Sequence, residues 1–122
     1  MSNSSLVSYT KISSNSSARA GKISKITPHH MAGNLSVETC GEIFSRPSRQ
    51  ASANYGVGSD GRIALYVDES RRSWVSSSAA NDQRAVTIEV ANSSRGGDWP
   101  VSAAAWHSLV TLCVGLFSKH PI

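Results

Sequence analysis

Two adjacent histidines, His29 and His30, have the side chains in this sequence best suited to binding a metal ion. They follow residues 23–28, which predict a β-strand, and neighbouring side chains on a strand point to opposite faces. One metal ion therefore rarely binds both rings, and we expect one of the two to be a ligand, with the other ring close by or in solvent. The alternative is a surface or capping role for both histidines.

Glu89 is the acidic residue whose position is most unusual. It lies between Ile88 and Val90 in residues 85–91, the most apolar strand that the sequence predicts. A carboxylate there costs free energy unless it is paired, hydrated or linked to a metal. Either its face of the sheet is open to water, or Glu89 is a general base whose pKa is tuned by partial burial.

Two aromatic residues occupy positions that often line a cleft. Tyr55 lies at the glycine-flanked entry of a predicted hairpin, with routine packing as the alternative. Trp74 lies in residues 70–84, a polar stretch that predicts a long irregular loop. Its ring either stacks on a sugar or packs the loop onto the core. His107 and His120 have no ligand-like partner nearby, and we assign no function to either.

The elements that carry these residues alternate between strands and helices. Strands are expected near residues 23–29, 62–67 and 85–91, and Asp60-Gly61 predicts a hairpin turn within residues 50–69. In the last strand Val86, Ile88 and Val90 should face one way, with Thr87, Glu89 and Ala91 facing the other.

Helices are expected near residues 36–46 and 102–118, with Ser36 and Ser102 as N-caps. Pro47 should end the first helix. The second helix should bury one apolar stripe, made of Trp106, Leu109, Val110, Cys113 and Phe117. Strands that alternate with helices predict an α/β or α+β fold with a mixed sheet.

Composition narrows the classes of partner. The chain has 122 residues, with 39% hydrophobic and 16% charged residues, a net charge of +4 and a pI of about 9.4. A mild positive balance suits an anionic partner. The basic residues are scattered and no nucleic-acid-binding motif is present, so nucleic-acid binding is disfavoured.

Cysteine content and terminal sequence indicate the redox chemistry and the compartment. Cys40 and Cys113 occupy apolar positions of the expected helices, which favours buried thiols over a disulfide. Residues 1–17 lack the features of a secretory signal, and no apolar stretch is long enough to span a membrane. We expect a chain made in the cytoplasm, with residues 1–22 forming an extended or disordered arm.

Three segments in order resemble the type-2 N-acetylmuramoyl-L-alanine amidase family, which includes phage endolysins, autolysins and peptidoglycan recognition proteins. Residues 27–33 read TPHHMAG, residues 54–62 read NYGVGSDGR, and residues 79–92 read AANDQRAVTIEVAN. The resemblance implies a mixed β-sheet flanked by helices, with zinc in a groove that holds the glycan and its stem peptide. Residues 23–122 would then be the N-terminal and central part of an amidase domain.

The resemblance also implies roles for individual residues. His29 falls on the first zinc ligand, Tyr55 on a tyrosine near the metal, and Glu89 on the glutamate that acts as catalytic base in several relatives. Trp74 and Asn81 are expected to contact substrate. The implied reaction is hydrolysis of the amide between N-acetylmuramic acid and L-alanine, by a protein of phage or prophage origin that acts on the wall after release. A non-catalytic peptidoglycan-binding module is the alternative.

Two departures from the family pattern affect these expectations. Pro28 stands where relatives usually carry an aliphatic strand residue. A proline at this position is expected to distort the backbone that orients His29. The family also continues with another strand, a second zinc histidine and a cysteine or aspartate ligand, whereas this sequence ends at Ile122. We therefore expect the zinc site to be incomplete in this chain, and its oligomeric state is left open.

Overall fold

A mixed five-stranded sheet forms the centre of the protein, whose computed structural model describes residues 3–76 and 78–122. The strand order is β1-β5-β4-β7-β3. The strands are β1 Tyr9–Thr10, β5 Ile63–Leu65, β4 Tyr55–Val57, β7 Ala85–Val90 and β3 Lys25–His30. Within this sheet, β7 is parallel to both β4 and β3, β1 is parallel to β5, and β4 and β5 pair antiparallel. The predicted fold class, a mixed central sheet flanked by helices, is confirmed.

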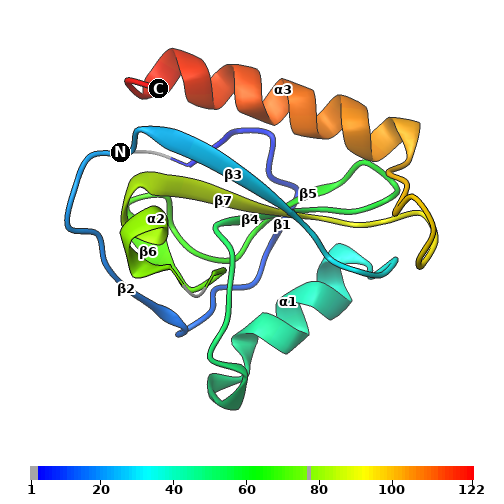
Figure 1. Cartoon of the computed structure of the whole chain (residues 1–122), viewed down its shortest axis with the longest axis horizontal. Coiled ribbons are helices and arrows are strands. Elements are labelled where there is room, and N and C mark those ends of the chain that lie inside the picture. The colour runs from blue at the N-terminus through cyan, green and yellow to red at the C-terminus, as the bar shows by residue number, and fades with distance from the viewer. Residues whose placement is uncertain (1–2, 77) are drawn as a thin grey trace.

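Two helices cover opposite faces of this sheet, α1 (Val37–Ser45) and α3 (Ala103–Lys119) (Figure 1). Each begins where the sequence places a serine cap. The hydroxyl of Ser36 accepts a hydrogen bond from the backbone of Thr39, and Ser102 does the same for Ala105. These bonds satisfy amides that the first helical turn leaves unpaired. Both predicted helices are confirmed.

The hairpin predicted around Asp60-Gly61 is present as strands β4 and β5. Gly61 has a φ of 86°, a left-handed conformation that glycine adopts without steric cost. Its amide donates to the carbonyl of Gly58, and the carboxylate of Asp60 accepts from the backbone of Arg62. The turn brings β5 back alongside β4, and the other edge of β4 pairs with β7.

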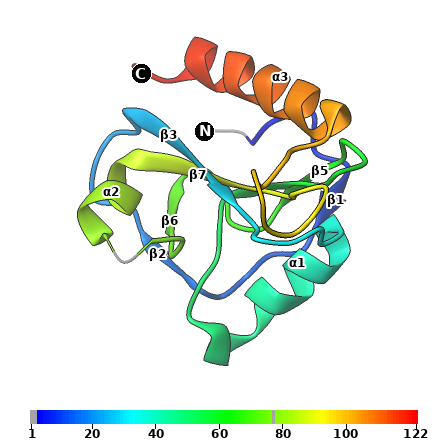
Figure 2. The same ribbon diagram turned by 45° about the vertical axis from the view of Figure 1, so that its right-hand side comes forward.

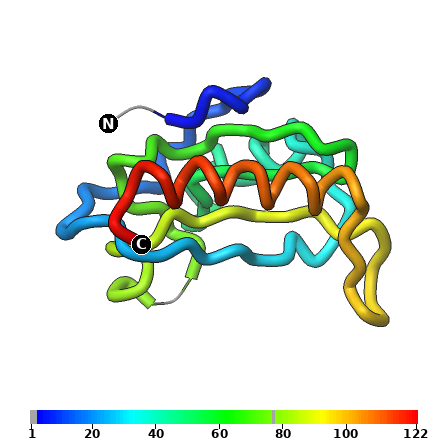
Figure 3. Tube along the Cα trace, turned by 90° about the horizontal axis from the view of Figure 1, so that it is seen from above, coloured from blue at the N-terminus to red at the C-terminus, as the bar shows by residue number. Residues whose placement is uncertain are grey.

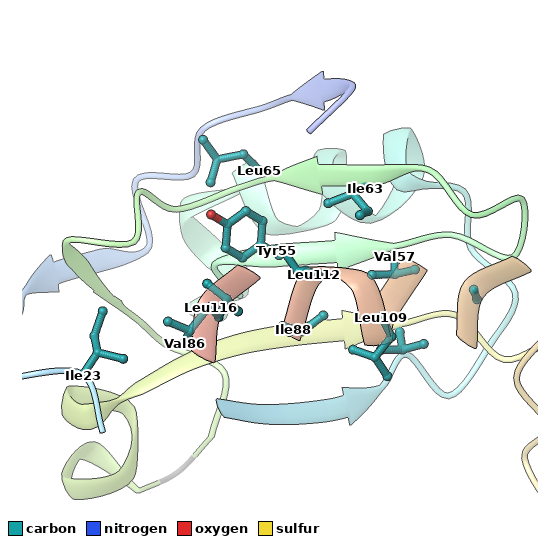
Figure 4. Close-up of a cluster of buried hydrophobic side chains, with 12 residues drawn as sticks. Ile23, Tyr55, Val57, Ile63, Leu65, Val86, Ile88, Leu109, Leu112 and Leu116 are labelled. Atoms are coloured by element: carbon teal, nitrogen blue, oxygen red, sulfur yellow. The ribbon is translucent and has the colours of Figure 1, made fainter. Parts of the chain in front are cut away.

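The alternation predicted for β7 is confirmed. Val86, Ile88 and Val90 join a core cluster that α3 completes with Leu109, Leu112 and Leu116 (Figure 4). The opposite face of β7 lies towards α1, where Glu89 lines a hollow together with Cys40 and Phe44. The sheet thus divides the interior into an α3 side and an α1 side.

The predicted apolar stripe of α3 is wrong in part. The buried residues of α3 are Ala105, Leu109, Leu112 and Leu116, whereas Trp106 is 60% exposed, Val110 46% and Phe117 55%. The helix carries apolar residues around most of its circumference, so spacing alone does not select the packed face. The exposed residues line an open groove of about 460 Å³ that Pro28 and His30 border. Figure 3 shows α3 over the middle of the sheet, with β3 to one side.

Residues 70–84 are more regular than the long irregular loop that the sequence predicts. They contain β6 (Arg71–Ser73) and α2 (Ala79–Arg84). β6 pairs antiparallel with β2 (Ser16–Ala18) from the N-terminal arm. This pairing joins segments far apart in the sequence, which a local pattern does not reveal. Figure 2 shows the three elements together at one end of the molecule.

The described part of the N-terminal arm, residues 3–22, is extended and packs against the domain. Asn15 is buried, and its amide nitrogen donates to the carbonyls of Phe44, Arg46 and Ala51. The arm thereby links the end of α1 to the 3₁₀ helix η1 (Pro47–Arg49) and the residues that follow it. The described part of the arm contributes the strands β1 and β2.

Candidate functional site

His29 and Glu89 lie opposite each other on neighbouring strands. The parallel register of β3 and β7 pairs His29 with Glu89, so both side chains leave the sheet on the same face. His29 Nε2 and Glu89 Oε2 are both buried and make no hydrogen bond within the part of the chain that the structure describes. Buried polar atoms without partners are rare, and they mark places where a ligand, ion or water belongs.

Pro28 does not distort the strand that aims His29. The register with β7 runs unbroken from Lys25 to His30. The amide of Met31 donates to Val90, and strand amides alternate in direction, so the nitrogen of Pro28 faces the open edge. Because an edge position needs no donor, β3 accepts the proline without losing a bond to β7.

Glu89 opens into a small hollow of about 70 Å³ beneath α1. Its other lining residues are Met31, Leu35, Cys40, Ile43, Phe44 and Arg49. Burial among these mainly apolar side chains raises the pKa of Glu89 to about 7, and the positive charge of Arg49 opposes part of that rise. A carboxyl group with this pKa holds or releases a proton near neutral pH, as a general acid or base must.

Gly56 leaves space for the Tyr66 ring, which packs on the α1 side of the sheet near Glu89. It pairs with Glu89 across β4 and β7, so a side chain there would emerge on the same face as the carboxylate. A Cβ atom at Gly56 would lie 2.5 Å from the ring of Tyr66, which is fully buried and donates its hydroxyl proton to the carbonyl of Val37. Glycine at this position therefore lets the Tyr66 ring pack against the sheet below α1.

His30 faces away from Glu89, as expected. Its register partner is Val90, whose side chain packs on the α3 side. The side-chain oxygen of Asn92 accepts from the amide of Ala32, which turns the Asn92 nitrogen towards His30 Nδ1 at 2.9 Å. Asn92 therefore donates to Nδ1, and a neutral His30 carries its proton on Nε2.

Tyr55 does not join His29 and Glu89, so the expected convergence of the three side chains on one groove is wrong. Tyr55 pairs with Ile88, which places its ring on the α3 side in the buried core (Figure 4). Its hydroxyl donates to Glu69 and accepts from the amide of Ser4. Burial, followed by the bond to Glu69, raises the pKa of Tyr55. The strand register thus separates Tyr55 from the candidate site.

The partners of Tyr55 form a buried polar cluster that sequence analysis missed. Glu69 has no exposed surface and accepts from Lys119 Nζ at 3.0 Å, and it bonds to His120 Nε2 at 2.8 Å. The cluster anchors the C-terminal end of α3 to the segment after β5. Glu69 and His120 are 51 positions apart, so no local sequence pattern predicts their contact.

Trp74 and Asn81 lie outside the candidate site. Trp74 is partly buried and donates its indole proton to the hydroxyl of Ser17, which packs it against the N-terminal arm. Asn81 lies in α2, where its backbone amide donates to the capping hydroxyl of Ser78. α2 joins the start of β7, and Glu89 lies about 13 Å further along that strand. The structure therefore does not bring these two residues to the hollow.

The residues present fit only part of a zinc centre. His29 offers one imidazole nitrogen on the same face of the sheet as the carboxylate of Glu89, and catalytic zinc takes three protein ligands and a water. Within residues 3–76 and 78–122, no group of three His, Cys, Asp or Glu side chains is placed to hold a metal ion. Within the same residues, no helix combines the length and apolar character that crossing a membrane requires.

The fold and site belong to a known class of protein. The sequence profile of the N-acetylmuramoyl-L-alanine amidase family matches residues 19–122, so the chain belongs to that family. The resemblance that the three sequence motifs carry is thereby confirmed. A search of curated protein sequences finds no match to the chain.

Solved structures of similar fold include enzymes and a recognition protein. A selenomethionine derivative of AmpD is 19% identical, with a TM-score of 0.76 over 97% of this chain and 77% of its own. The endolysin amidase LysCS from Clostridium intestinale is 18% identical, with a TM-score of 0.71 over 98% and 80%. The Drosophila peptidoglycan recognition protein SA is 16% identical, with a TM-score of 0.67 over 93% and 74%. At these identities the structures establish a shared fold.

Proposed function

We propose that the chain is the core of a peptidoglycan hydrolase that cuts the amide between N-acetylmuramic acid and L-alanine. The observation that carries the proposal is the His29–Glu89 pair, two cross-strand side chains that each present a buried polar atom without a partner. Membership of the amidase family supports the same bond as the target. We further propose a phage or prophage origin and action on the wall after release, which the likeness to an endolysin supports.

Glu89 is the residue that moves protons in this proposal. Above its pKa of about 7, the ionised carboxylate takes a proton from the water that attacks the amide carbonyl. The carboxylic acid so formed gives that proton to the nitrogen of L-alanine as the carbon–nitrogen bond breaks. Glu89 then returns to its starting charge, and the products are the lactyl carboxylate and a free amino group.

His29 is the residue that would contribute to holding zinc, with the unpartnered Nε2 as the donor atom. Bound zinc supplies a more acidic water and polarises the carbonyl. Among the described residues, no group of three possible ligand side chains includes His29, so His29 does not hold the ion without further ligands. The part of the mechanism assigned to this chain is therefore proton transfer by Glu89 and the orientation of substrate beside it.

A second candidate function is peptidoglycan binding without hydrolysis. The ligand count favours it, because binding a muramyl peptide over the hollow beside Glu89 does not require zinc. The likeness to a recognition protein is compatible with this alternative. The two functions predict the same ligand and differ in turnover.

Purified Gram-positive peptidoglycan separates the two functions when binding and hydrolysis are measured on the same samples. Co-sedimentation measures binding, and the appearance of L-alanine amino groups with added zinc measures hydrolysis. A hydrolase should release amino groups with the wild-type chain, slowly because zinc is only weakly held, and not with Glu89→Gln, while both bind. Binding without release supports the recognition module, and absence of binding by the folded protein would overturn both. Glu42→Gln, on the exposed face of α1, is the matched control.

A further inference from the structure

Arg49 is a positive charge at the mouth of the Glu89 hollow that the proposed reaction leaves unused. It is the last residue of η1 and lines the hollow together with Glu89. Its side chain is exposed, and among the described residues its guanidinium forms no hydrogen bond or ion pair. By contrast, the guanidinium of Arg62 binds both Glu38 and Asp60, and that of Arg19 binds backbone carbonyls.

The backbone that carries Arg49 is held from both sides. The amide nitrogen of Asn15, which is 3% exposed, donates to the carbonyl of Arg46 at 2.9 Å and to that of Ala51 at 3.2 Å. These two carbonyls flank η1, so one buried side chain fixes the start and the end of the turn. Gln50 closes it in a left-handed conformation, with a φ of 51°. The long, positively charged side chain of Arg49 is therefore attached to a backbone turn that hydrogen bonds hold in place, and it lies beside the hollow.

Arg49 lines the same hollow as Glu89 and Cys40, so its charge acts on groups in that hollow. The positive charge of Arg49 acts on Glu89, where it opposes the effect of burial on the pKa. It acts in the same direction on Cys40 at the back of the hollow. A ligand beside Glu89 would therefore lie in the field of an unpaired guanidinium, whose planar fork matches a carboxylate.

We propose that Arg49 binds a carboxylate of the stem peptide while the amide to be cut lies beside Glu89. The inference rests on the proposed function, since it assumes that the muramyl peptide binds across the opening of the hollow, which at about 70 Å³ is too small to enclose it. The N-acetylated sugar carries no net charge to pair with a guanidinium, whereas glutamate in the stem supplies carboxylates. Arg49 therefore orients the substrate with its peptide towards η1, and it selects stems with free carboxylates over amidated ones.

The test compares two soluble probes on the full 122-residue chain. One is N-acetylmuramoyl-L-alanyl-D-glutamate, and the other is the same compound with both glutamate carboxylates converted to amides. Dissociation constants are measured by NMR titration in EDTA, which prevents metal-dependent turnover. The variants are Arg49→Gln, which removes the charge, and Arg49→Lys, which keeps the charge without the fork. Arg46→Gln is the matched control, because Arg46 is also exposed and does not line the hollow.

The wild-type chain and Arg46→Gln should bind the diacid roughly three- to tenfold more tightly than the diamide. Arg49→Gln should bind both probes equally, and Arg49→Lys should fall between. Equal binding of the probes by the wild type, or an equal loss in Arg46→Gln, would overturn the role of Arg49 and leave the proposed function standing. Failure of a folded wild-type chain to bind either probe would overturn both.

Discussion

Replacing Glu89 by glutamine should stabilise the protein at pH 8, because it removes a charge that burial penalises. The ordinary pKa of the carboxyl group is 4.5, and burial raises it to about 7 in the folded protein. That difference corresponds to about 3 kcal/mol, at about 1.4 kcal/mol for each tenfold change in the ionisation constant. Glu89 is partly exposed, and water screens part of the penalty, so we expect a gain of about 1–3 kcal/mol.

The sign of the pH dependence makes this prediction specific. Below pH 4.5 both folded and unfolded chains are protonated at Glu89, and the substitution should change little. Between pH 4.5 and 7 the unfolded chain ionises while the folded chain keeps its proton, so the wild type loses stability as pH rises. Above pH 7 the difference between the two proteins should be constant.

Urea denaturation at pH 4, 5.5, 7 and 8 measures this gap in the free energy of unfolding. Glu42→Gln is the control, because the Glu42 side chain is 59% exposed and its substitution should change the free energy of unfolding by no more than about 0.5 kcal/mol at every pH. A Glu89→Gln protein no more stable than the wild type at pH 8 would refute the reasoning. A gap as large at pH 4 as at pH 8 would show that the effect is not ionisation.

Three further predictions concern other parts of the molecule. Glu69→Gln should lower the free energy of unfolding by about 2–4 kcal/mol in thermal or urea melts, because it leaves Lys119 and the buried His120 without their carboxylate; an unchanged melt would contradict this. Calorimetry should show weak zinc binding that His29→Gln weakens further, whereas tight one-to-one binding would mean that other ligands exist. Phe117→Ser should reduce the fluorescence of an apolar dye that binds the exposed face of α3, with the melting temperature nearly unchanged; equal dye binding would place the apolar surface elsewhere.

Local features of the sequence were sufficient for the elements whose signals are short-range. Ser36 and Ser102 cap helices because a side-chain hydroxyl serves amides of the turn that follows it. Asp60-Gly61 makes the hairpin turn because glycine accepts a positive φ. The strand from Ala85 to Val90 alternates because successive side chains point to opposite faces.

Strand register decided which candidate residues meet. The sequence singled out His29, Tyr55 and Glu89, but it contains no local signal for how strands far apart along the chain align. The parallel register sets His29 opposite Glu89, and it sets Gly56 rather than Tyr55 beside that carboxylate. A shift of one residue would have reversed the faces, so the composition of the site depends on tertiary pairing.

The packed face of α3 and the buried Glu69 cluster were likewise decided by tertiary structure. α3 is apolar around most of its surface, and only contact with β4 and β7 selects Leu112 and Leu116 over Phe117 as core. Glu69 and His120 are unremarkable in sequence and become a buried pair only when the end of α3 reaches the segment after β5. The sequence by itself therefore determined the family, the elements and the chemical types at the site. The fold determined which of those side chains share a face, because burial and contact arise only between segments that the chain brings together.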